Sequence, residues 1–187
     1  KCVDFMAILT LLFLSNVVQA QASNGFAYVT NTAPSNNSVS VININTNTVI
    51  TTIPVGSEPR GITAHSATHR VYVANTYSHS VSVINSLTNT VIATIPVVGY
   101  PLGITVSNDG NRVYTADFGP DNTVSVIDAS TNTVLTTLTG FSNPQNLVEN
   151  STGTRLYVAN SNCCSTTPGF ISVLDVTNNY IVLATIP

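Results

Sequence analysis

The chain has 187 residues, of which 43% are hydrophobic and only 7% are charged, and its net charge is -3. Ordinary globular domains carry about 25% charged residues. Asn, Thr and Ser supply the polarity instead, at 68 of the 187 residues, and these types favour strands and turns. The composition predicts an all-β protein that is one domain or a piece of a larger one. With one lysine and four arginines, the chain offers no phosphate-binding surface, which argues against nucleic acid as a partner.

The N-terminal stretch has the pattern of a secretory signal. Residues 5–14 form an apolar run that is too short to span a bilayer. Lys1 precedes the run, and the small residues Ala20 and Ala22 follow it at positions that suit signal peptidase. We therefore predict a signal peptide over residues 1–22, cleaved after residue 20 or 22. The mature chain is then expected to be secreted, displayed at a cell surface or periplasmic, with no transmembrane segment.

Cys163 and Cys164 are adjacent, and the third cysteine, Cys2, lies in the predicted signal. In an oxidising compartment such a pair can form a vicinal disulfide, remain as two loop thiols, or bond to other chains. Metal binding needs further ligands at suitable spacing, and the sequence has none nearby. The sequence thus predicts neither a metal site nor a cofactor.

Four copies of one β-rich pattern fill the rest of the chain. Their tyrosine anchors are separated by 44, 42 and 43 residues, a period typical of four-stranded propeller blades. Each full copy contains four short β-rich runs, here called strands a to d, with turn residues between them. The anchors, each in strand b, are Tyr28, Tyr72, Tyr114 and Tyr157.

The copies predict a partial propeller over residues 23–187. The first copy begins at its strand b, so we expect three full blades and a three-stranded first blade. This falls short of the roughly 4–8 blades that close a ring. The sequence therefore favours a fragment of a larger propeller over a complete open arc, whose first blade would leave a strand edge unpaired. The expected blades span about 26–54, 61–97, 103–138 and 146–187.

The repeated motif resembles that of a known family. Tyr28–Asn31 reads YVTN, and Tyr72–Asn75 and Tyr157–Asn160 both read YVAN, with Val-Ser-Val-Ile or a close relative following. These motifs are similar to the YVTN repeat of β-propellers from cell-surface and periplasmic proteins, which are usually seven-bladed. Tyr114–Asp117, which reads YTAD, departs from the motif. The resemblance implies the fold and says little about function, because propellers host binding modules and enzymes alike.

Comparing the copies separates structural residues from candidates for function. A residue present in every copy is explained by blade construction, whereas one present in a single copy needs another reason. The arginines before strand b and the Asn or Asp residues that open the c–d turns recur, so we assign them to the scaffold. They are Arg70, Arg112 and Arg155, and Asn43, Asn85, Asp128 and Asp175.

The b–c loops carry every length difference between the copies, whereas the other connections keep a constant length. In an antiparallel meander the b–c and d–a connections share one face. Loop variation on a regular scaffold is how repeat folds adjust binding, so this face is the predicted binding face. Its aromatic residues can stack on sugars, anchor a peptide, or simply cap the core. The ligand-binding candidates are Tyr77, Tyr100, Phe118, Phe141, Phe170, Glu58, Arg60 and Asp121.

Glu149 stands in a strand a where the other copies have Ala64 and Val106, so it is a candidate for lining a central channel. The three histidines have no recurring metal spacing, and a lone histidine in a turn is usually solvated. Haem-attachment and Gly-x-Ser-x-Gly motifs do not occur, so no catalytic residue is predicted.

Three functions remain open on the sequence alone. The first is a secreted or surface-displayed propeller that binds a protein or glycan without chemistry of its own. The second is a piece of a lactonase-like or lyase-like propeller enzyme whose catalytic residues lie in other blades. The third is a structural surface-layer or adhesin module.

Overall fold

The computed structural model describes residues 20–23, 25–33, 36–161 and 168–187. Within these residues the regular structure consists of β-strands in four antiparallel sheets of four strands each. In every sheet the strands lie in chain order, as expected for a meander. The prediction of an all-β fold built from propeller blades is confirmed.

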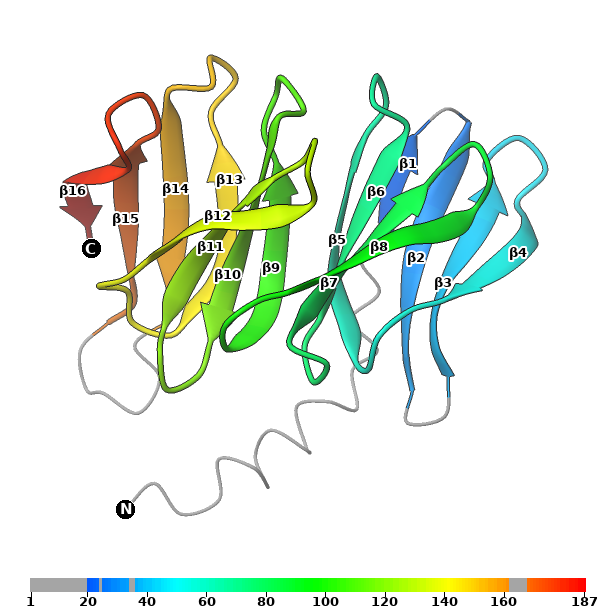
Figure 1. Ribbon diagram of the computed structural model, residues 1–187, viewed down its shortest axis with the longest axis horizontal. Helices are drawn as coiled ribbons and strands as arrows, with labels where there is room; N and C mark the ends of the chain where they lie inside the picture. Colours follow the sequence, from blue (N-terminus) through cyan, green and yellow to red (C-terminus); the bar gives the residue numbers. More distant parts are fainter. Residues whose placement is uncertain (1–19, 24, 34–35, 162–167) are drawn as a thin grey trace.

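The four sheets, numbered here as blades 1 to 4, follow one another along the chain (Figure 1). Blade 1 contains β1 (Ala20–Ser23), β2 (Phe26–Ala33), β3 (Asn36–Asn43) and β4 (Thr48–Pro54). Blade 2 contains β5 (Pro59–His65), β6 (Arg70–Asn75), β7 (Ser80–Asn85) and β8 (Thr90–Pro96). Blade 3 contains β9 (Tyr100–Val106), β10 (Arg112–Phe118), β11 (Thr123–Asp128) and β12 (Thr133–Leu138). Blade 4 contains β13 (Pro144–Glu149), β14 (Arg155–Asn160), β15 (Phe170–Asp175) and β16 (Ile181–Ile186).

Blade 1 differs from the expectation by one strand. Its b, c and d strands are β2, β3 and β4, and β1 adds a fourth strand beside β2, with Ala20 opposite Val29 and Ser23 opposite Phe26. The physical reason is that the free edge of β2 presents unpaired backbone groups, which β1 satisfies. Cleavage after residue 20 or 22 stays a prediction, and it would fall inside β1.

The first strands of successive blades lie side by side: β1 contacts β5, β5 contacts β9, and β9 contacts β13. The blades form an arc with blades 1 and 4 at its two ends (Figure 1). The described b–c connections, β6–β7 and β10–β11, and the d–a connections lie on the lower side of this view, and we call that side the variable-loop face. The c–d turns and the a–b turns of blades 2 to 4 lie on the upper side, which we call the turn face.

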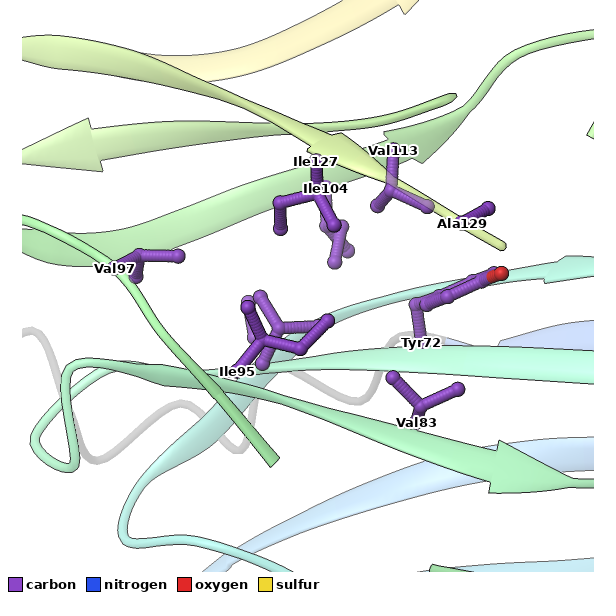
Figure 2. Packing of buried hydrophobic residues seen from close by; sticks show 10 residues of the cluster. Tyr72, Val83, Ile95, Val97, Ile104, Val113, Ile127 and Ala129 are labelled. Carbon is purple, nitrogen blue, oxygen red and sulfur yellow. The ribbon is translucent and has the colours of Figure 1, made fainter. Parts of the chain in front are cut away.

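The core lies between neighbouring blades, where alternate residues of each strand face the next sheet. Figure 2 shows the interface of blades 2 and 3, where Tyr72, Val83 and Ile95 meet Ile104 and Ile127. Tyr72, Val83 and Ile127 are fully buried. Burying one such side chain stabilises the fold by about 1.5–3 kcal/mol, so the recurring apolar positions hold the blades together.

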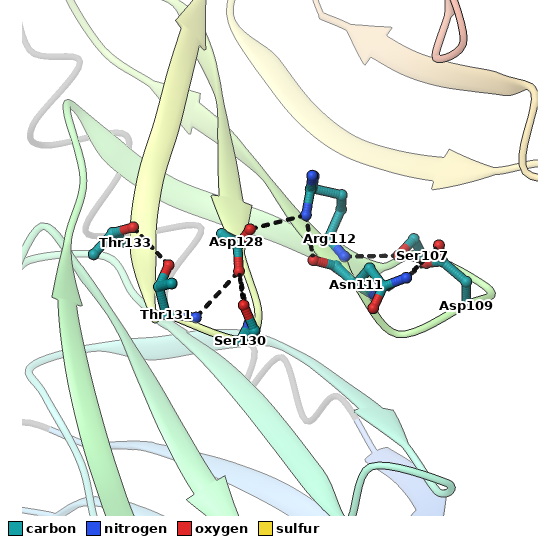
Figure 3. Close-up of polar contacts among 8 residues, drawn as sticks. All are labelled: Ser107, Asp109, Asn111, Arg112, Asp128, Ser130, Thr131 and Thr133. Atoms are coloured by element: carbon teal, nitrogen blue, oxygen red, sulfur yellow. Dashed lines mark hydrogen bonds and ion pairs between the residues drawn. The ribbon is translucent and has the colours of Figure 1, made fainter.

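The turn face contains the recurring polar residues, as predicted. The Oδ1 atom of Asp128 accepts hydrogen bonds from the backbone N–H groups of Ser130 (2.8 Å) and Thr131 (3.1 Å), and Arg112 lies 3.1 Å from Oδ2 (Figure 3). These bonds hold the pKa of Asp128 at about 2, with the Ser130 hydroxyl as the largest cause. Asn85 makes the same turn in blade 2, bonding to the N–H groups of Leu87 and Thr88.

Candidate functional site

Four of the predicted binding residues come together where blades 2 and 3 meet the variable-loop face. Tyr77 belongs to the β6–β7 connection, Tyr100 begins β9, and Glu58 and Arg60 lie at the start of blade 2. They come from three separate connections of the chain, and strand order brings these connections to one end of the sheets.

The centre of this region is an aromatic cluster, which we define as Tyr77, His79 and Tyr100. The ring centroids of Tyr77 and Tyr100 are 6.1 Å apart, with the rings edge-on at 75°. The ring of His79 lies 4.6 Å from that of Tyr100, tilted by 46°. Tyr77 is 43% exposed and His79 is also exposed, whereas Tyr100 is half-buried. The cluster thus presents aromatic surface to solvent on a partly buried base.

Backbone hydrogen bonds fix the connection that carries Tyr77. The N–H of Thr76 donates to the carbonyl of Glu58 (3.0 Å), and the N–H of Tyr77 donates to that of Ser57 (3.2 Å). Glu58 itself has a left-handed backbone conformation, with φ of 52°. Its N–H donates to Oδ1 of Asn37 in blade 1 (3.0 Å). The β4–β5 and β6–β7 connections therefore form one braced unit.

Glu58 and Arg60 form an ion pair of 3.4 Å next to Tyr77, and their side chains are 22% and 16% exposed. Burial lowers the pKa of Arg60 below its ordinary value, while the Glu58 carboxylate opposes this shift. Burial, followed by the Glu58 charge, raises the pKa of Tyr77. Such planar charged groups can make paired hydrogen bonds to a polar ligand.

The Nδ1–H of His79 donates to the carbonyl of Gly99 in the β8–β9 connection, at 2.5 Å. A carbonyl can only accept, so this bond requires the proton on Nδ1. His79 is in a left-handed conformation, with φ of 48°, which turns its ring back over Tyr100. The sequence did not single out His79 as a site residue. The sequence feature that could have identified it is its position two residues after Tyr77 in a variable loop.

A cavity of about 520 Å³ lies between the outer parts of blades 1 and 2. Ser78, the neighbour of Tyr77, is part of its lining, so the cavity begins beside the aromatic cluster. Its walls carry hydroxyl groups, proline rings and small apolar side chains, with no charged residue among them. The lining residues are Pro54, Val55, Gly56, Ser78, Ser80, Ser82, Val91, Thr94 and Pro96.

The other predicted binding residues take different places. Phe118 is half-buried at the end of β10, directly opposite Tyr100 in the strand register, so it borders the aromatic cluster. Asp121 is exposed in the β10–β11 connection. Phe170 is half-buried at the start of β15 in blade 4, opposite Asn160. Phe141 is only 8% exposed and packs in the core between blades 3 and 4. Its ring therefore caps the core, and it is no longer a ligand-binding candidate.

Glu149 lies at the turn-face end of β13, and its place in a central channel stays a prediction. Its Oε2 accepts hydrogen bonds from the backbone N–H (2.8 Å) and the side-chain Nδ2 (2.9 Å) of Asn108 in blade 3. His65 of blade 2 contacts the carbonyl of the same Asn108 at 3.2 Å. Glu149 also borders a cavity of about 250 Å³ that Tyr114 and Arg112 line. Its principal contacts brace blade 4 against blade 3.

Asp117 is the second residue that sequence reasoning left without a role. It is fully buried near the variable-loop face, and burial raises its pKa to about 7. The sequence feature that could have identified Asp117 is that it replaces the asparagine of the repeat motif, so that this copy reads YTAD. Cys163 and Cys164 lie outside the described residues, so their pairing stays a prediction.

Among the residues that the structure describes, no group of three or more His, Cys, Asp or Glu side chains is placed to hold a metal ion. The described part of the chain also contains no helix of the length and apolar character needed to cross a membrane.

Comparisons with known proteins identify the fold. No family model and no curated protein matches the sequence. The structure is similar to Kuenenia stuttgartiensis hydrazine synthase, with a TM-score of 0.83 and 23% identity, over 89% of this chain and 47% of that one. It is also similar to a functionally unknown protein from Desulfotomaculum acetoxidans, with a TM-score of 0.74 and 16% identity, over 90% of this chain and 54% of that one. The chain spans about half the length of these structures. At these identities the likeness shows a propeller-like fold alone.

Proposed function

We propose that this chain is a YVTN-type β-propeller protein, secreted or displayed at a surface, whose variable-loop face binds a glycan or a protein. The YVTN assignment is supported by the four motif copies, and secretion by the signal-like N-terminal pattern. The binding role is supported by the aromatic cluster, which is the observation that carries this proposal. The chain acts as a scaffold for that face and performs no chemistry of its own.

A glycan is the ligand class that the geometry favours. The face of a sugar ring stacks on an exposed aromatic ring, and Tyr77 offers such a ring at 43% exposure. The ion pair of Glu58 and Arg60 stands next to it with polar atoms for paired hydrogen bonds to neighbouring hydroxyl groups. Aromatic residues and arginine are also the side chains that contribute most at binding surfaces.

The cavity beside Ser78 supports the same ligand class. Its volume of about 520 Å³ lies in the range of small-molecule sites, about 300–1,000 Å³. Hydroxyl groups and small apolar groups in its lining suit an uncharged, hydroxyl-rich ligand. A chain bound across Tyr77 can extend into this cavity.

The test is binding of the purified chain to panels of neutral oligosaccharides and of peptides, followed by the Kd of each hit. Tyr77→Ala is expected to weaken binding by roughly tenfold or more, as for other hot-spot side chains. Tyr77→Phe keeps the ring and is expected to retain most of the affinity. Tyr100→Ala and Phe118→Ala are expected to weaken binding less, because both rings are half-buried.

Leu87→Ala is the matched control, because Leu87 is 68% exposed on the turn face. It should leave binding unchanged. Peptide binding that depends on Tyr77 would assign the same face to a protein partner. Unchanged binding after truncation of Tyr77, Tyr100 and Phe118 together would remove the proposed site.

Secretion has its own test. Expression of the chain in a secreting host and N-terminal sequencing of the released protein should show a start at residue 21 or 23. Retention of residues 1–20 in the product would contradict the proposed signal peptide.

A further inference from the structure

The b strand of three blades carries, at or near its end, an asparagine that is bonded to a serine of the neighbouring c strand. The Nδ2 group of Asn31 donates to Ser40 (2.9 Å), that of Asn75 to Ser82 (2.9 Å), and that of Asn160 to Ser172 (3.0 Å). In each case the amide is the donor and the serine hydroxyl the acceptor. The arrangement recurs, so it belongs to blade construction.

Blade 3 has Asp117 at this position, and the hydrogen bond reverses. Here the Ser125 hydroxyl donates to Oδ2 of Asp117 at 2.5 Å, a bond that an ionised carboxylate and a neutral acid can both accept. Oδ1 is buried and has no hydrogen-bond partner among the described residues. The nearby Thr115 and Thr123 hydroxyls favour the charged form, but neither is in hydrogen-bonding geometry. A fully buried carboxylate with one bonded oxygen is costly, whereas the neutral acid is tolerated.

Asp117 lies one residue pair from Tyr100 in the strand register and packs against the β8–β9 connection that precedes Tyr100. In the strand register it is opposite Pro101, and the next pair is Phe118 with Tyr100. A Cβ atom at Gly99 would lie 3.3 Å from Cβ of Asp117, so the β8–β9 connection packs on this side chain. The carbonyl of Gly99 holds His79. Gly99 therefore links the two: it packs on Asp117, directly precedes Tyr100 in the chain, and accepts the hydrogen bond from His79.

Resting on the binding site proposed above, we propose that Asp117 is a positioning residue: as a neutral acid it holds the β8–β9 connection closed under Tyr100 and His79, and its ionisation opens that connection. Opening lets water reach the carboxylate and moves the carbonyl that fixes His79. The aromatic cluster then loses its base, and the ligand binds more weakly. The proposal gives the variable-loop face a dependence on pH that the asparagine-bearing blades lack.

The direction follows from linkage between opening and proton release. A solvated aspartate ionises near pH 3.9, whereas burial raises the pKa of Asp117 to about 7 in the closed form. Between these values only the opened form releases its proton, so the opening constant rises by roughly tenfold per pH unit. Above about pH 7 both forms are ionised and the opening constant levels off.

Other titratable groups on the packed elements are His79 and Tyr77 on the β6–β7 connection, Tyr100 on β9, and Asp121 on the β10–β11 connection. His79 contacts the same loop through the Gly99 carbonyl, so a variant without this histidine is needed as a control. The variant His79→Gln removes it and leaves Asp117 in place.

The experiment is hydrogen exchange at the Gly99 and Tyr100 amides from pH 5 to pH 8, corrected for the intrinsic rate, together with the NMR signals of the Tyr100 ring. In the unaltered chain and in His79→Gln, opening should rise by roughly tenfold per unit up to about pH 7 and then level. Asp117→Asn introduces the residue of the other blades, so it should fold and show a flat profile. The amides of Thr76 and Tyr77, bonded to the β4–β5 connection, serve as internal controls and should not follow this profile.

Equal pH profiles for Asp117→Asn and the unaltered chain would overturn the proposal, as would loss of the profile in His79→Gln alone. This readout needs no ligand. If no oligosaccharide or peptide binds but the profile appears as expected, the proposed ligand fails while the role of Asp117 in the loop stands.

Discussion

Blades 2 and 3 share one framework and differ at two polar positions with opposite consequences. On the turn face, Asn85 of blade 2 corresponds to Asp128 of blade 3, and both accept backbone hydrogen bonds that close the c–d turn. Near the variable-loop face, Asn75 corresponds to Asp117, and here the hydrogen bond changes direction. Replacing asparagine by aspartate therefore keeps the hydrogen bonds of the c–d turn but alters the hydrogen bonding of the buried position.

The difference shows what the two environments require. The turn needs only an acceptor, which an amide and a carboxylate both supply, and Asp128 adds an ion pair at the surface. At the buried position the amide of the other blades donates to serine oxygens, and an ionised carboxylate has no proton to donate. Where that donor is lost, the blade must bury an acid instead. In blade 3, protonation of Asp117 is therefore coupled to the packing of the β8–β9 connection.

The largest expected effect tests what the blades share. Tyr72→Ala and Tyr114→Ala remove fully buried rings, and each should lower the free energy of unfolding by about 3–5 kcal/mol. Tyr157→Ala should cost clearly less, because Tyr157 is only half-buried in blade 4. Urea denaturation of the three variants checks this order. Equal losses at all three positions would contradict the assignment of the core to blade interfaces.

The next prediction transfers the acid from blade 3 to blade 2. Asn75→Asp should destabilise the chain by about 4 kcal/mol at pH 7, with burial raising the new pKa as it does for Asp117. An acid whose pKa is raised on folding destabilises the folded state at a pH where the unfolded chain is ionised. The loss of unfolding free energy should therefore shrink by about 1.4 kcal/mol per unit as the pH falls from 7 toward 4. Asp117→Asn should show the opposite change. Denaturation curves at pH 4, 5.5, 7 and 8 measure both.

Backbone conformation distinguishes the loops that enter the two blades. Gly99 has φ of +79°, and a Cβ there would lie 3.0 Å from the carbonyl oxygen of Phe118. Gly99→Ala should therefore cost about 1–2 kcal/mol. Ser57→Ala, at the corresponding position before blade 2, should change stability by less than about 0.5 kcal/mol. Thermal unfolding of the pair is the measurement, and a larger loss for Ser57→Ala would contradict it.

The smallest effect is expected on the turn face. Asp128→Asn should leave the Tm at pH 7 nearly unchanged, because Asn85 closes the same turn without a charge. The pKa of Asp128 is lowered to about 2, so its contribution should be present above about pH 4 and lost as the pH falls through 2. NMR titration of the carboxyl group checks the value. Titration near pH 4 would contradict the hydrogen bonds described for this turn.

Much of the fold could be predicted because its causes are local. Strand alternation, turn residues and the spacing of the tyrosines repeat along the chain, so each copy predicts the next. The same comparison assigned Arg112 and Asp128 to the scaffold, since they recur, and the two side chains bond to each other across the paired strands β10 and β11. The extra strand β1 was not expected, because Ala20–Ser23 overlaps the signal-like segment and its pairing depends on the free edge of β2.

The candidate site was predicted only in part. Loop variation and the geometry of an antiparallel meander placed Glu58, Tyr77 and Tyr100 on one face, but did not indicate which of their side chains meet. Phe141 and Tyr77 looked equivalent as loop aromatics, yet one is buried between blades and the other is exposed. The sequence recorded Asp117 as a departure from the motif without indicating that its carboxyl is buried next to the β8–β9 connection.

The sequence by itself determined the blade: its four strands, its turns and the apolar positions that face its neighbours. These follow from side-chain alternation and turn chemistry within about 40 residues. Only the tertiary structure decided which loop residues form the aromatic cluster and that Asp117 is buried beside the connection leading to Tyr100. The reason is that contacts between connections depend on how neighbouring blades pack, and burial, which raises the pKa of Asp117, exists only after they have packed.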